Sequence, residues 1–175
     1  SEVERCAENG VEFIELPVAI DGLTVGVNPE NDFVQCLTLE ELHTMWAPES
    51  EGEIKRWNQV RSSWPDERLQ LYGPGVDSGT FDYFTETVNG EAQSSRGDFT
   101  SSERDNVLVV GIAGDRGSLG YFGYSYFVEN QDILKMVAID SGNGCVFPTD
   151  ETINNGTYAP LSRPLFIYVS KESWA

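Results

Sequence analysis

The sequence predicts an α/β domain in which helices flank a mixed β-sheet. β-branched and aromatic residues gather in two runs near the ends of the chain, at residues 11–27 and 164–169. Between these runs, segments with helical apolar spacing alternate with short β-prone segments, which is typical of helices packed on a sheet. The length of 175 residues and the 39% hydrophobic content are those of one ordinary globular domain.

The two β-prone runs predict a paired connection. Pro17 and Gly22 interrupt residues 11–27, so we expect two strands or one bent strand there. Residues 164–169 form a second strongly β-prone run that ends before the polar residue Ser170. We expect the two runs to pair with each other.

The first ten residues have the pattern of a helix that ends at Gly10. Because the chain opens abruptly inside this pattern, without an initiator Met or a signal peptide, we expect it to be a piece of a longer protein. No apolar run approaches the roughly 20 residues that a membrane-spanning helix needs.

Capping patterns predict two further helices. Residues 38–41 form a capping box that opens a short helix ending before Pro48. Residues 100–103 form a second capping-box pattern, and we expect the apolar run at residues 107–112 to be a helix that stops at Gly114.

Short strands are expected between these helices. The predicted strands are residues 69–72, residues 117–124, whose glycines permit close backbone approach, and residues 133–139. Trp57 and Trp64 flank a polar stretch and are expected to be buried or edge aromatics.

The acidic charge limits the kinds of partner. A formal net charge of −18 repels a polyphosphate backbone, and no Lys/Arg cluster is visible in the sequence, so we expect no nucleic-acid partner. A small anion is disfavoured too, unless the site uses neutral hydrogen-bond donors directed at one point and shielded from the global field.

The chain has three cysteines, Cys6, Cys36 and Cys145, and one histidine, His43. No C-x-x-C spacing is present, so no metal site is expected. His43 falls on the helix after residue 38, where a structural or exposed role is expected. The cysteines form either one disulfide plus a free thiol or three small buried residues, and their spacing leaves both possibilities open.

The most informative stretch is residues 72–84, which runs from a strand through a glycine-rich bend into an amphipathic helix that Gly90 ends. Ser78 stands at the N-cap, with Gly79 and Thr80 in the first turn. The backbone N–H groups there lack partners inside the helix, and the helix dipole places partial positive charge at the same point. Such a helix N-terminus suits a tetrahedral oxyanion.

Two other roles for Ser78 stay open. It could only cap its own helix, as most such serines do. It could also be a nucleophile, because Asp77-Ser78-Gly79 superficially resembles a catalytic elbow. However, the full G-x-S-x-G pattern is absent and His43 is the only imidazole in the chain. The bend is no Walker loop, since it lacks the Gly-Lys-Ser/Thr ending.

Several motifs in order resemble the bacterial phosphate-binding proteins of phosphate ABC transporters. The resemblance spans nearly the whole chain and is carried by residues 77–84 (DSGTFDYF), 95–99 (SRGDF), 105–109 (DNVLV), 119–124 (LGYFGY) and 161–168 (LSRPLFIY).

The resemblance implies a type II periplasmic-binding-protein-like fold, with two α/β lobes joined by a hinge that close on phosphate. It assigns phosphate binding to Ser78, Gly79 and Thr80, with Asp77 beside them. It also implies a binding protein without enzymatic activity or cofactor, exported to the periplasm or cell surface, with a membrane permease as partner. The implied division is residues 1–20 as a remnant of lobe one and the first hinge strand, residues 21–163 as lobe two, and residues 164–175 as the returning hinge strand.

One departure from the family concerns the cation. Many members carry an Arg shortly before the Ser-Gly-Thr, whereas Pro74 and Val76 occupy those places here. Arg96 is therefore a candidate phosphate ligand. A surface arginine that pairs with Asp98 or Glu103 is the alternative.

The resemblance also bears on the cysteines. An exported protein permits disulfides, so Cys36 and Cys145 are expected to form a bridge within this lobe, and Cys6 to have its partner outside the chain. Because the N-terminal part of lobe one is missing from this sequence, exposed core surface makes self-association another expectation.

Overall fold

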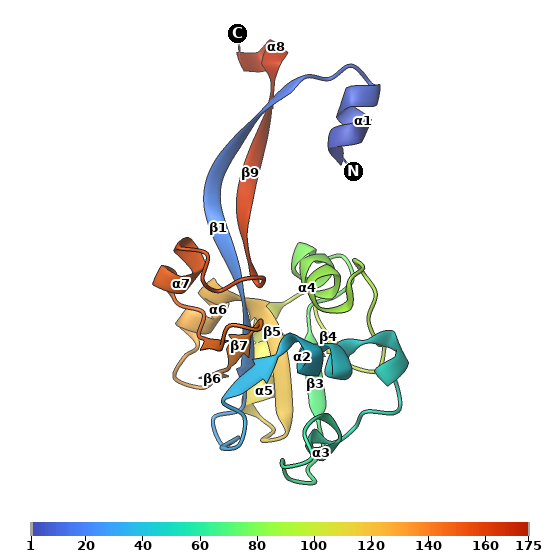
Figure 1. Cartoon of the computed structure of the whole chain (residues 1–175), viewed down its shortest axis with the longest axis vertical. Helices are drawn as coiled ribbons and strands as arrows, with labels where there is room; N and C mark the ends of the chain where they lie inside the picture. Colours follow the sequence, from blue (N-terminus) through green and yellow to red (C-terminus); the bar gives the residue numbers. More distant parts are fainter. Residues whose placement is uncertain (1, 175) are drawn as a thin grey trace.

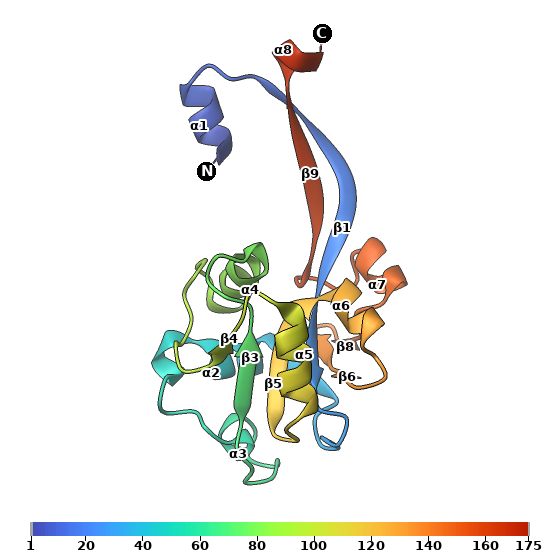
Figure 2. The same ribbon diagram turned by 180° about the vertical axis from the view of Figure 1, so that it is seen from behind.

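A two-stranded ribbon projects from one end of an α/β body in the computed structural model, which describes residues 2–174 (Figure 1). The ribbon consists of β1 (Phe13–Val27) and β9 (Ser162–Ser170), which pair antiparallel with a register shift between Pro17 and Ala19. The predicted pairing and the bent first strand are therefore confirmed. Two short helices, α1 (Glu2–Glu8) and α8 (Lys171–Trp174), lie at the far end of the ribbon (Figure 2).

β1 continues from the ribbon into the body, and its environment changes near Gly22. The preceding residues are exposed or half-buried, whereas residues 22–27 are all buried. In the body, β1 pairs antiparallel with β5 (Ser118–Gly123) and β6 (Lys135–Met136).

The body contains the predicted mixed sheet. β3 (Gln70–Gly73) runs parallel to β5 on one side and to β4 (Thr100–Ser101) on the other, which gives the order β4-β3-β5-β1-β6. Along this path two neighbouring pairs are parallel and two are antiparallel, and β9 pairs antiparallel with β1 off the path, so the sheet is mixed as the sequence predicts.

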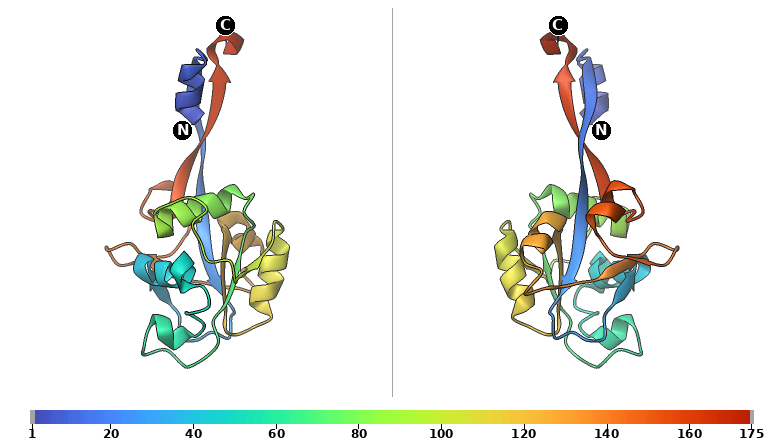
Figure 3. Two further views of the ribbon diagram at one scale, coloured as in Figure 1. Left: turned by 90° about the vertical axis from the view of Figure 1, so that its right-hand side faces the viewer. Right: turned by 90° about the vertical axis from the view of Figure 1, so that its left-hand side faces the viewer.

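Helices cover both faces of this sheet (Figures 2 and 3). α5 (Asp105–Ala113) packs on one face against Phe122, and α2 (Leu39–Trp46) and α4 (Gly79–Asn89) pack on the other, around Tyr121. Gly120 lies where β5 approaches its neighbours: a Cβ there would lie 2.6 Å from the carbonyl oxygen of Tyr72. The close backbone approach predicted for this glycine-rich strand is thus confirmed.

Local capping signals succeed in α2 and fail in α5. Thr38 caps α2 with a complete capping box, as predicted. α5 ends at Gly114 as predicted, but the capping box at residues 100–103 was wrong: Thr100 and Ser101 pair with β3 as strand β4, and Arg104 takes the N-cap position. Ladder hydrogen bonds to a neighbouring strand satisfy this backbone instead of a helix cap.

A second, three-stranded sheet was not predicted. β7 (Ala138–Asp140) lies between β2 (Cys36–Thr38) and β8 (Cys145–Val146). The single strand predicted at residues 133–139 is wrong in extent, because Lys135 and Met136 pair with β1 while the chain from Ala138 onward pairs in the second sheet. A disulfide joins the outer strands through Cys36 and Cys145, with 6.0 Å between their Cα atoms, which confirms the expected pairing.

The remaining elements connect these layers. Trp57 and Trp64 are buried and pack edge to face, 5.5 Å between ring centroids, in agreement with the sequence prediction.

Within residues 2–174 we find no helix with the length and apolar character that crossing a membrane requires. The short elements not yet named are η1 (Pro48–Ser50), α3 (Trp57–Val60), α6 (Tyr124–Glu129) and α7 (Asp150–Asn154).

Candidate functional site

The N-terminus of α4 forms as the sequence predicts. Ser78 has extended backbone angles (φ −89°, ψ 129°), and its Oγ accepts a hydrogen bond from the Thr80 N–H at 3.2 Å. Gly90 ends the helix with φ of 83°, in the left-handed region that favours glycine. Phe81, Phe84 and Val88 supply the buried face that anchors α4 to the body.

The glycine-rich bend before α4 is fixed by packing. The Ser78 N–H donates to the Gly75 carbonyl at 3.1 Å, which closes a turn directly before the helix. A Cβ on Gly73 would meet the rings of Tyr121, Phe99 and Trp46 at 3.1 to 3.3 Å, so the chain crosses the aromatic core closely at this point. The helix N-terminus is therefore held on a rigid support.

Backbone donors are free at this terminus. In the described part of the chain, the N–H groups of Gly79 and Phe81 have no hydrogen-bond acceptor. Gly79 is exposed, and a Cβ built there would contact only the Nη2 of Arg163, at 3.9 Å. An anion can thus approach the positive end of the helix dipole without meeting a side chain of the helix itself.

A cation that the sequence analysis did not assign lies beside these donors. Arg163, at the start of β9, donates from Nη2 to the Gly79 carbonyl at 3.3 Å. Its guanidinium carbon lies 4.2 Å from the centroid of the Tyr83 ring, in cation–π geometry. The Nε of Arg163 is buried and finds no hydrogen-bond partner among residues 2–174.

Tyr83 fixes the position of Arg163. Its phenol donates a hydrogen bond to the carbonyl of Pro160, three residues before Arg163 in the chain. Burial raises the pKa of Tyr83, and the charge of Arg163 lowers it by less, so the phenol stays protonated and keeps donating at neutral pH. The guanidinium is therefore positioned by its contacts with Gly79 and Tyr83 of α4.

Two carboxylates also lie at this terminus. Asp77 is exposed one residue before the N-cap. Asp82 lies in the first turn of α4, and its Oδ1 is buried with no hydrogen-bond partner in the described part of the chain. Because acids lie on both sides of Ser78, they repel an incoming anion. The positive charge of Arg163 opposes this repulsion.

Arg96 does not join these residues, contrary to the sequence prediction. It is 4% exposed and bound in a fork to Asp98, with Nε to Oδ1 at 2.5 Å and Nη2 to Oδ2 at 2.9 Å. Its Nη1 donates to the carbonyls of Met45 and Ile54. The alternative of a pair with Asp98 is the observed one, although Arg96 is buried and not on the surface.

The nucleophile alternative for Ser78 finds no support in the geometry. The Nδ1 of His43 lies 3.0 Å from the Oδ1 of Asn89, the last residue of α4. Eleven residues of helix separate Asn89 from Ser78, which is roughly 16 Å at 1.5 Å per residue. The imidazole is at the opposite end of α4 and cannot take a proton from Ser78. Within residues 2–174, we find no cluster of three or more His, Cys, Asp or Glu side chains suited to a metal ion.

Arg163 could have been suspected from sequence only with knowledge of the fold. It stands in the stretch Leu161-Ser-Arg-Pro, which the family resemblance includes in a motif without assigning Arg163 a role. Its contacts with Gly79 and Tyr83 join residues 80 or more positions apart, and no local sequence pattern predicts such contacts.

Comparison with known proteins gives consistent matches over the whole chain. The family described as PBP superfamily domain matches residues 1–175. Protein SphX of Synechocystis sp. is 50% identical over 169 residues, which cover 97% of this chain and 50% of that protein. The phosphate-binding protein PstS of Staphylococcus epidermidis is 38% identical over 173 residues, which cover 98% of this chain and 51% of the relative. This chain spans about half the length of the curated relatives it matches.

Solved structures agree with this comparison. A crystal structure described as a possible phosphate binding protein from Planctomyces limnophilus is 51% identical, with a TM-score of 0.87 over 98% of this chain and 60% of that one. A putative phosphate ABC transporter substrate-binding protein from Clostridium perfringens, with bound phosphate, has a TM-score of 0.74 over 98% of this chain and 63% of that one. At 23% identity, the latter match supports the fold alone.

Proposed function

Because this chain belongs to the PBP superfamily domain family, we propose that it binds inorganic phosphate as part of the extracytoplasmic receptor of a phosphate ABC uptake transporter. The observation that supports the proposal is the N-terminus of α4, where no acceptor is found among the described residues for the amides of Gly79 and Phe81, and where Arg163 contacts the Gly79 carbonyl. These are the donors that a tetrahedral oxyanion requires.

We propose that residues 21–163 form one lobe of the receptor. Residues 1–20 then contain a remnant of the other lobe and the first hinge strand, and residues 164–175 contain the returning hinge strand. The exposed two-stranded ribbon of β1 and β9 supports this division, as does the length of the relatives, about twice that of this chain. The rest of such a receptor would enclose the anion from the opposite side.

The proposed ligand set is centred on the first turn of α4. The N–H groups of Gly79 and Phe81 and the hydroxyls of Ser78 and Thr80 donate to phosphate oxygens. Ser78 can do this while it caps the helix, because a hydroxyl that accepts a bond through a lone pair still has its own proton to donate. Arg163 supplies the cation that the family pattern places before the Ser-Gly-Thr.

Asp77 completes the proposed set. A carboxylate next to the anion penalises a fully ionised ligand and accepts a hydrogen bond from a protonated one, so it favours hydrogen phosphate over sulfate. Arg96 is left out of the set, because Asp98 and two backbone carbonyls occupy four of its five N–H donors.

The proposed role needs no chemistry at Ser78. The receptor would bind phosphate outside the cytoplasm and present it to a membrane permease. If Ser78 were instead a nucleophile, the protein would turn over a phosphate or acyl ester, and Ser78→Ala would abolish the turnover. We expect no turnover in either form.

A titration of the ¹⁵N-labelled chain with inorganic phosphate tests the proposal. We expect saturable shifts of the Gly79, Thr80 and Phe81 amide resonances, and weak affinity, because half of the enclosing donors are missing. Thr80→Val should weaken phosphate binding by about 1 to 3 kcal/mol, the scale of an unmatched hydrogen bond to a charge.

The matched control is Thr44→Val, which removes a hydroxyl bonded to its own helix in α2. It should leave the phosphate affinity unchanged, and sulfate should shift the α4 amides less than phosphate does. Absence of any shift at residues 79–81, or equal affinities of the Thr80→Val variant and the parent chain, would remove this terminus from phosphate binding.

A further inference from the structure

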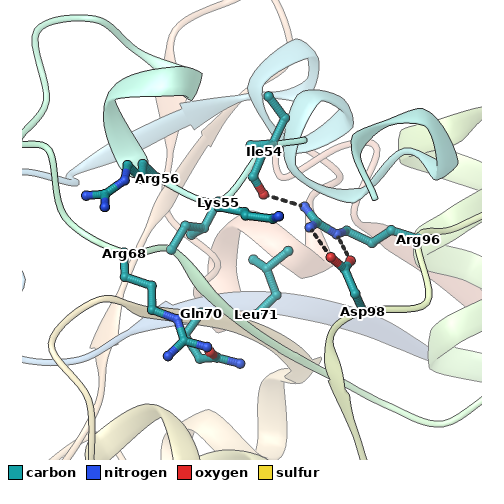
Figure 4. Close-up of a pocket in the computed structure, with 9 residues that line it drawn as sticks. Ile54, Lys55, Arg56, Arg68, Gln70, Leu71, Arg96 and Asp98 are labelled. Carbon is teal, nitrogen blue, oxygen red and sulfur yellow. Dashed lines mark hydrogen bonds and ion pairs between the residues drawn. The ribbon is translucent and has the colours of Figure 1, made fainter. Parts of the chain in front are cut away.

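A second candidate site lies apart from the N-terminus of α4. A cavity of about 360 Å³ is formed around the amino-terminal end of β3, and its lining includes none of residues 77–80 (Figure 4). Three separate segments contribute to it: residues 54–56, residues 68–71 and the pair Arg96 and Asp98. α4 follows the opposite, carboxyl-terminal end of β3, so the two places are distinct.

This cavity concentrates positive charge in an acidic protein. Of the 11 Lys and Arg residues in the chain, four line it: Lys55, Arg56, Arg68 and Arg96. Asp98 is the only carboxylate among the lining residues, while the whole chain carries a net charge of −18. The sequence shows no Lys/Arg cluster because the fold assembles this one from segments up to 41 residues apart.

The Arg96–Asp98 pair forms a fixed wall of the cavity. Both oxygens of Asp98 are occupied by Arg96, and Oδ2 also accepts from the Gly52 N–H at 3.0 Å. The hydrogen bond from Arg96 is the main cause that holds the pKa of Asp98 at about 2, so the carboxylate stays ionised at neutral pH. The negative charge of Asp98 is therefore paired with Arg96, and within residues 2–174 neither Lys55 nor Arg68 forms a hydrogen bond or ion pair with it.

Two of the remaining cations, Lys55 and Arg68, form no ion pair among the described residues. Arg56 is bound to Asp66 at 3.1 Å and points away from the cavity in Figure 4. No side-chain hydrogen bond or ion pair is formed by Lys55 or Arg68 within residues 2–174. Figure 4 shows Lys55 extended in the direction of Arg96, whose charge is already paired with Asp98. Lys55 and Arg68 therefore have no carboxylate of their own among the lining residues, and an anion in the cavity would supply the missing negative charge.

Apolar side chains lie directly beside these charges. Ile54, Leu69 and Leu71 line the same cavity, and Figure 4 shows Leu71 directed into the space between Lys55 and Asp98. Leu69 and Leu71 are buried, so the floor of the cavity is rigid core. A ligand that fits has a charged head for the cations and an apolar body for this floor.

We propose that this cavity binds a small organic oxyanion, with its phosphate or carboxylate head on Lys55 and Arg68 and its apolar body on Leu71 and Ile54. The binding is independent of the phosphate site proposed above, since the two places share no residue. Because Lys55 and Arg68 are exposed, binding weakens as salt screens them.

A titration of the ¹⁵N-labelled chain with phenyl phosphate at low ionic strength tests this site. We expect saturable shifts at the amides of Lys55, Arg68 and Leu71, and tighter binding there than for inorganic phosphate, which lacks the apolar body, or for phenol, which lacks the charge. The double variant Lys55→Gln/Arg68→Gln should bind phenyl phosphate roughly tenfold more weakly at this cavity, from the loss of two exposed charge interactions.

Arg116→Gln is the matched control, because it removes one exposed arginine charge, paired with Asp32, outside the cavity. It should leave the affinity unchanged. The inference fails if the Lys55, Arg68 and Leu71 amides do not shift, if the double variant binds as tightly as the parent, or if inorganic phosphate binds there as well as phenyl phosphate. Should the double variant not fold, loss of the shifts on raising salt to about 0.15 M supports the site, and salt-independent shifts contradict it. Shifts at Gly79 and Thr80 report the α4 site separately, so failure of either proposal is recognisable.

Discussion

The Nη2 of Arg163 donates a hydrogen bond to the backbone carbonyl of Gly79, 84 residues earlier in the chain. This contact joins the start of strand β9 in the ribbon to the first turn of helix α4. Arg163 also pairs across the ribbon with Asp21 of β1. A change in the course of the ribbon would therefore move a positive charge relative to the donors of Gly79 and Thr80.

Replacement of Arg163 tests its role as the cation of the proposed phosphate site. Arg163→Gln removes the charge and the stacking on Tyr83, and we expect phosphate binding to weaken by about tenfold or more, the scale of a lost charge-assisted hydrogen bond. Arg163→Lys keeps the charge but not the planar fork, so its affinity should lie between the two. Isothermal titration with phosphate gives the three dissociation constants.

Arg116→Gln again serves as a control for the loss of one positive charge, and it should change the phosphate affinity little at physiological salt. An Arg163→Gln variant that binds phosphate as tightly as the parent would show that the cation lies elsewhere.

The Arg96–Asp98 pair makes stability depend on acid pH. The folded-state pKa of Asp98, about 2, lies below the ordinary carboxyl value of 3.8, so the unfolded chain binds this proton more readily. The stabilisation from Asp98 is therefore complete above the unfolded pKa and is lost as pH falls through the window from about 4 to 2. Urea denaturation at several pH values measures the unfolding free energy of the parent and of Asp98→Asn. Between about pH 4 and 2 the unfolding free energy should fall less steeply in Asp98→Asn than in the parent.

At neutral pH, Asp98→Asn should cost roughly 3 kcal/mol of unfolding free energy, because it leaves the buried Arg96 without its counter-charge. The comparison is Asp32→Asn, which removes an 80%-exposed carboxylate paired with Arg116 and should cost less than about 1 kcal/mol. Equal losses in the two variants would mean that the Arg96 pair behaves as an ordinary surface pair.

The disulfide should be a major source of stability. Cys36 and Cys145 are 109 residues apart. A disulfide that closes a loop of that size in the unfolded chain stabilises the fold by at most about 4 to 5 kcal/mol, and the typical stabilisation is about 2 to 4 kcal/mol. We expect Cys36→Ala/Cys145→Ala to lower the unfolding free energy by such an amount, measured by thermal or urea denaturation.

Cys6→Ala is the control for this pair, because Cys6 is a free cysteine on α1 at the far end of the ribbon. It should leave the stability of the body unchanged, and a reducing agent should destabilise the parent chain but not the double variant. A parent chain that is insensitive to reductant under conditions that break the bond would contradict the prediction.

Features set by neighbouring residues could be predicted from the sequence. The Thr38 capping box, the Ser78 N-cap and the stop at Gly90 each depend on side chains and backbone within a few residues, and all three form as expected. The strand β5 also follows from local pattern, because Gly120 allows the close backbone approach to Tyr72.

Features set by distant partners could not be predicted in this way. Thr100 and Ser101 look like a helix cap but pair with β3, because a strand 28 residues away offers their backbone better partners. Arg96 was expected near Ser78, but its acceptors include the carbonyls of Met45 and Ile54, more than 40 residues earlier. Arg163 was missed for the same reason. The chain segment that contains Arg163 carries no local sign of its contacts with α4.

A crystal structure of the chain grown with phosphate tests the central claim most directly. We expect a tetrahedral anion at the N-terminus of α4, with its oxygens within hydrogen-bond distance of the Gly79 amide, the Thr80 hydroxyl and the guanidinium of Arg163. Phosphate density away from the Ser78–Thr80 turn, with the Gly79 and Phe81 amides bonded to other groups, would contradict the account.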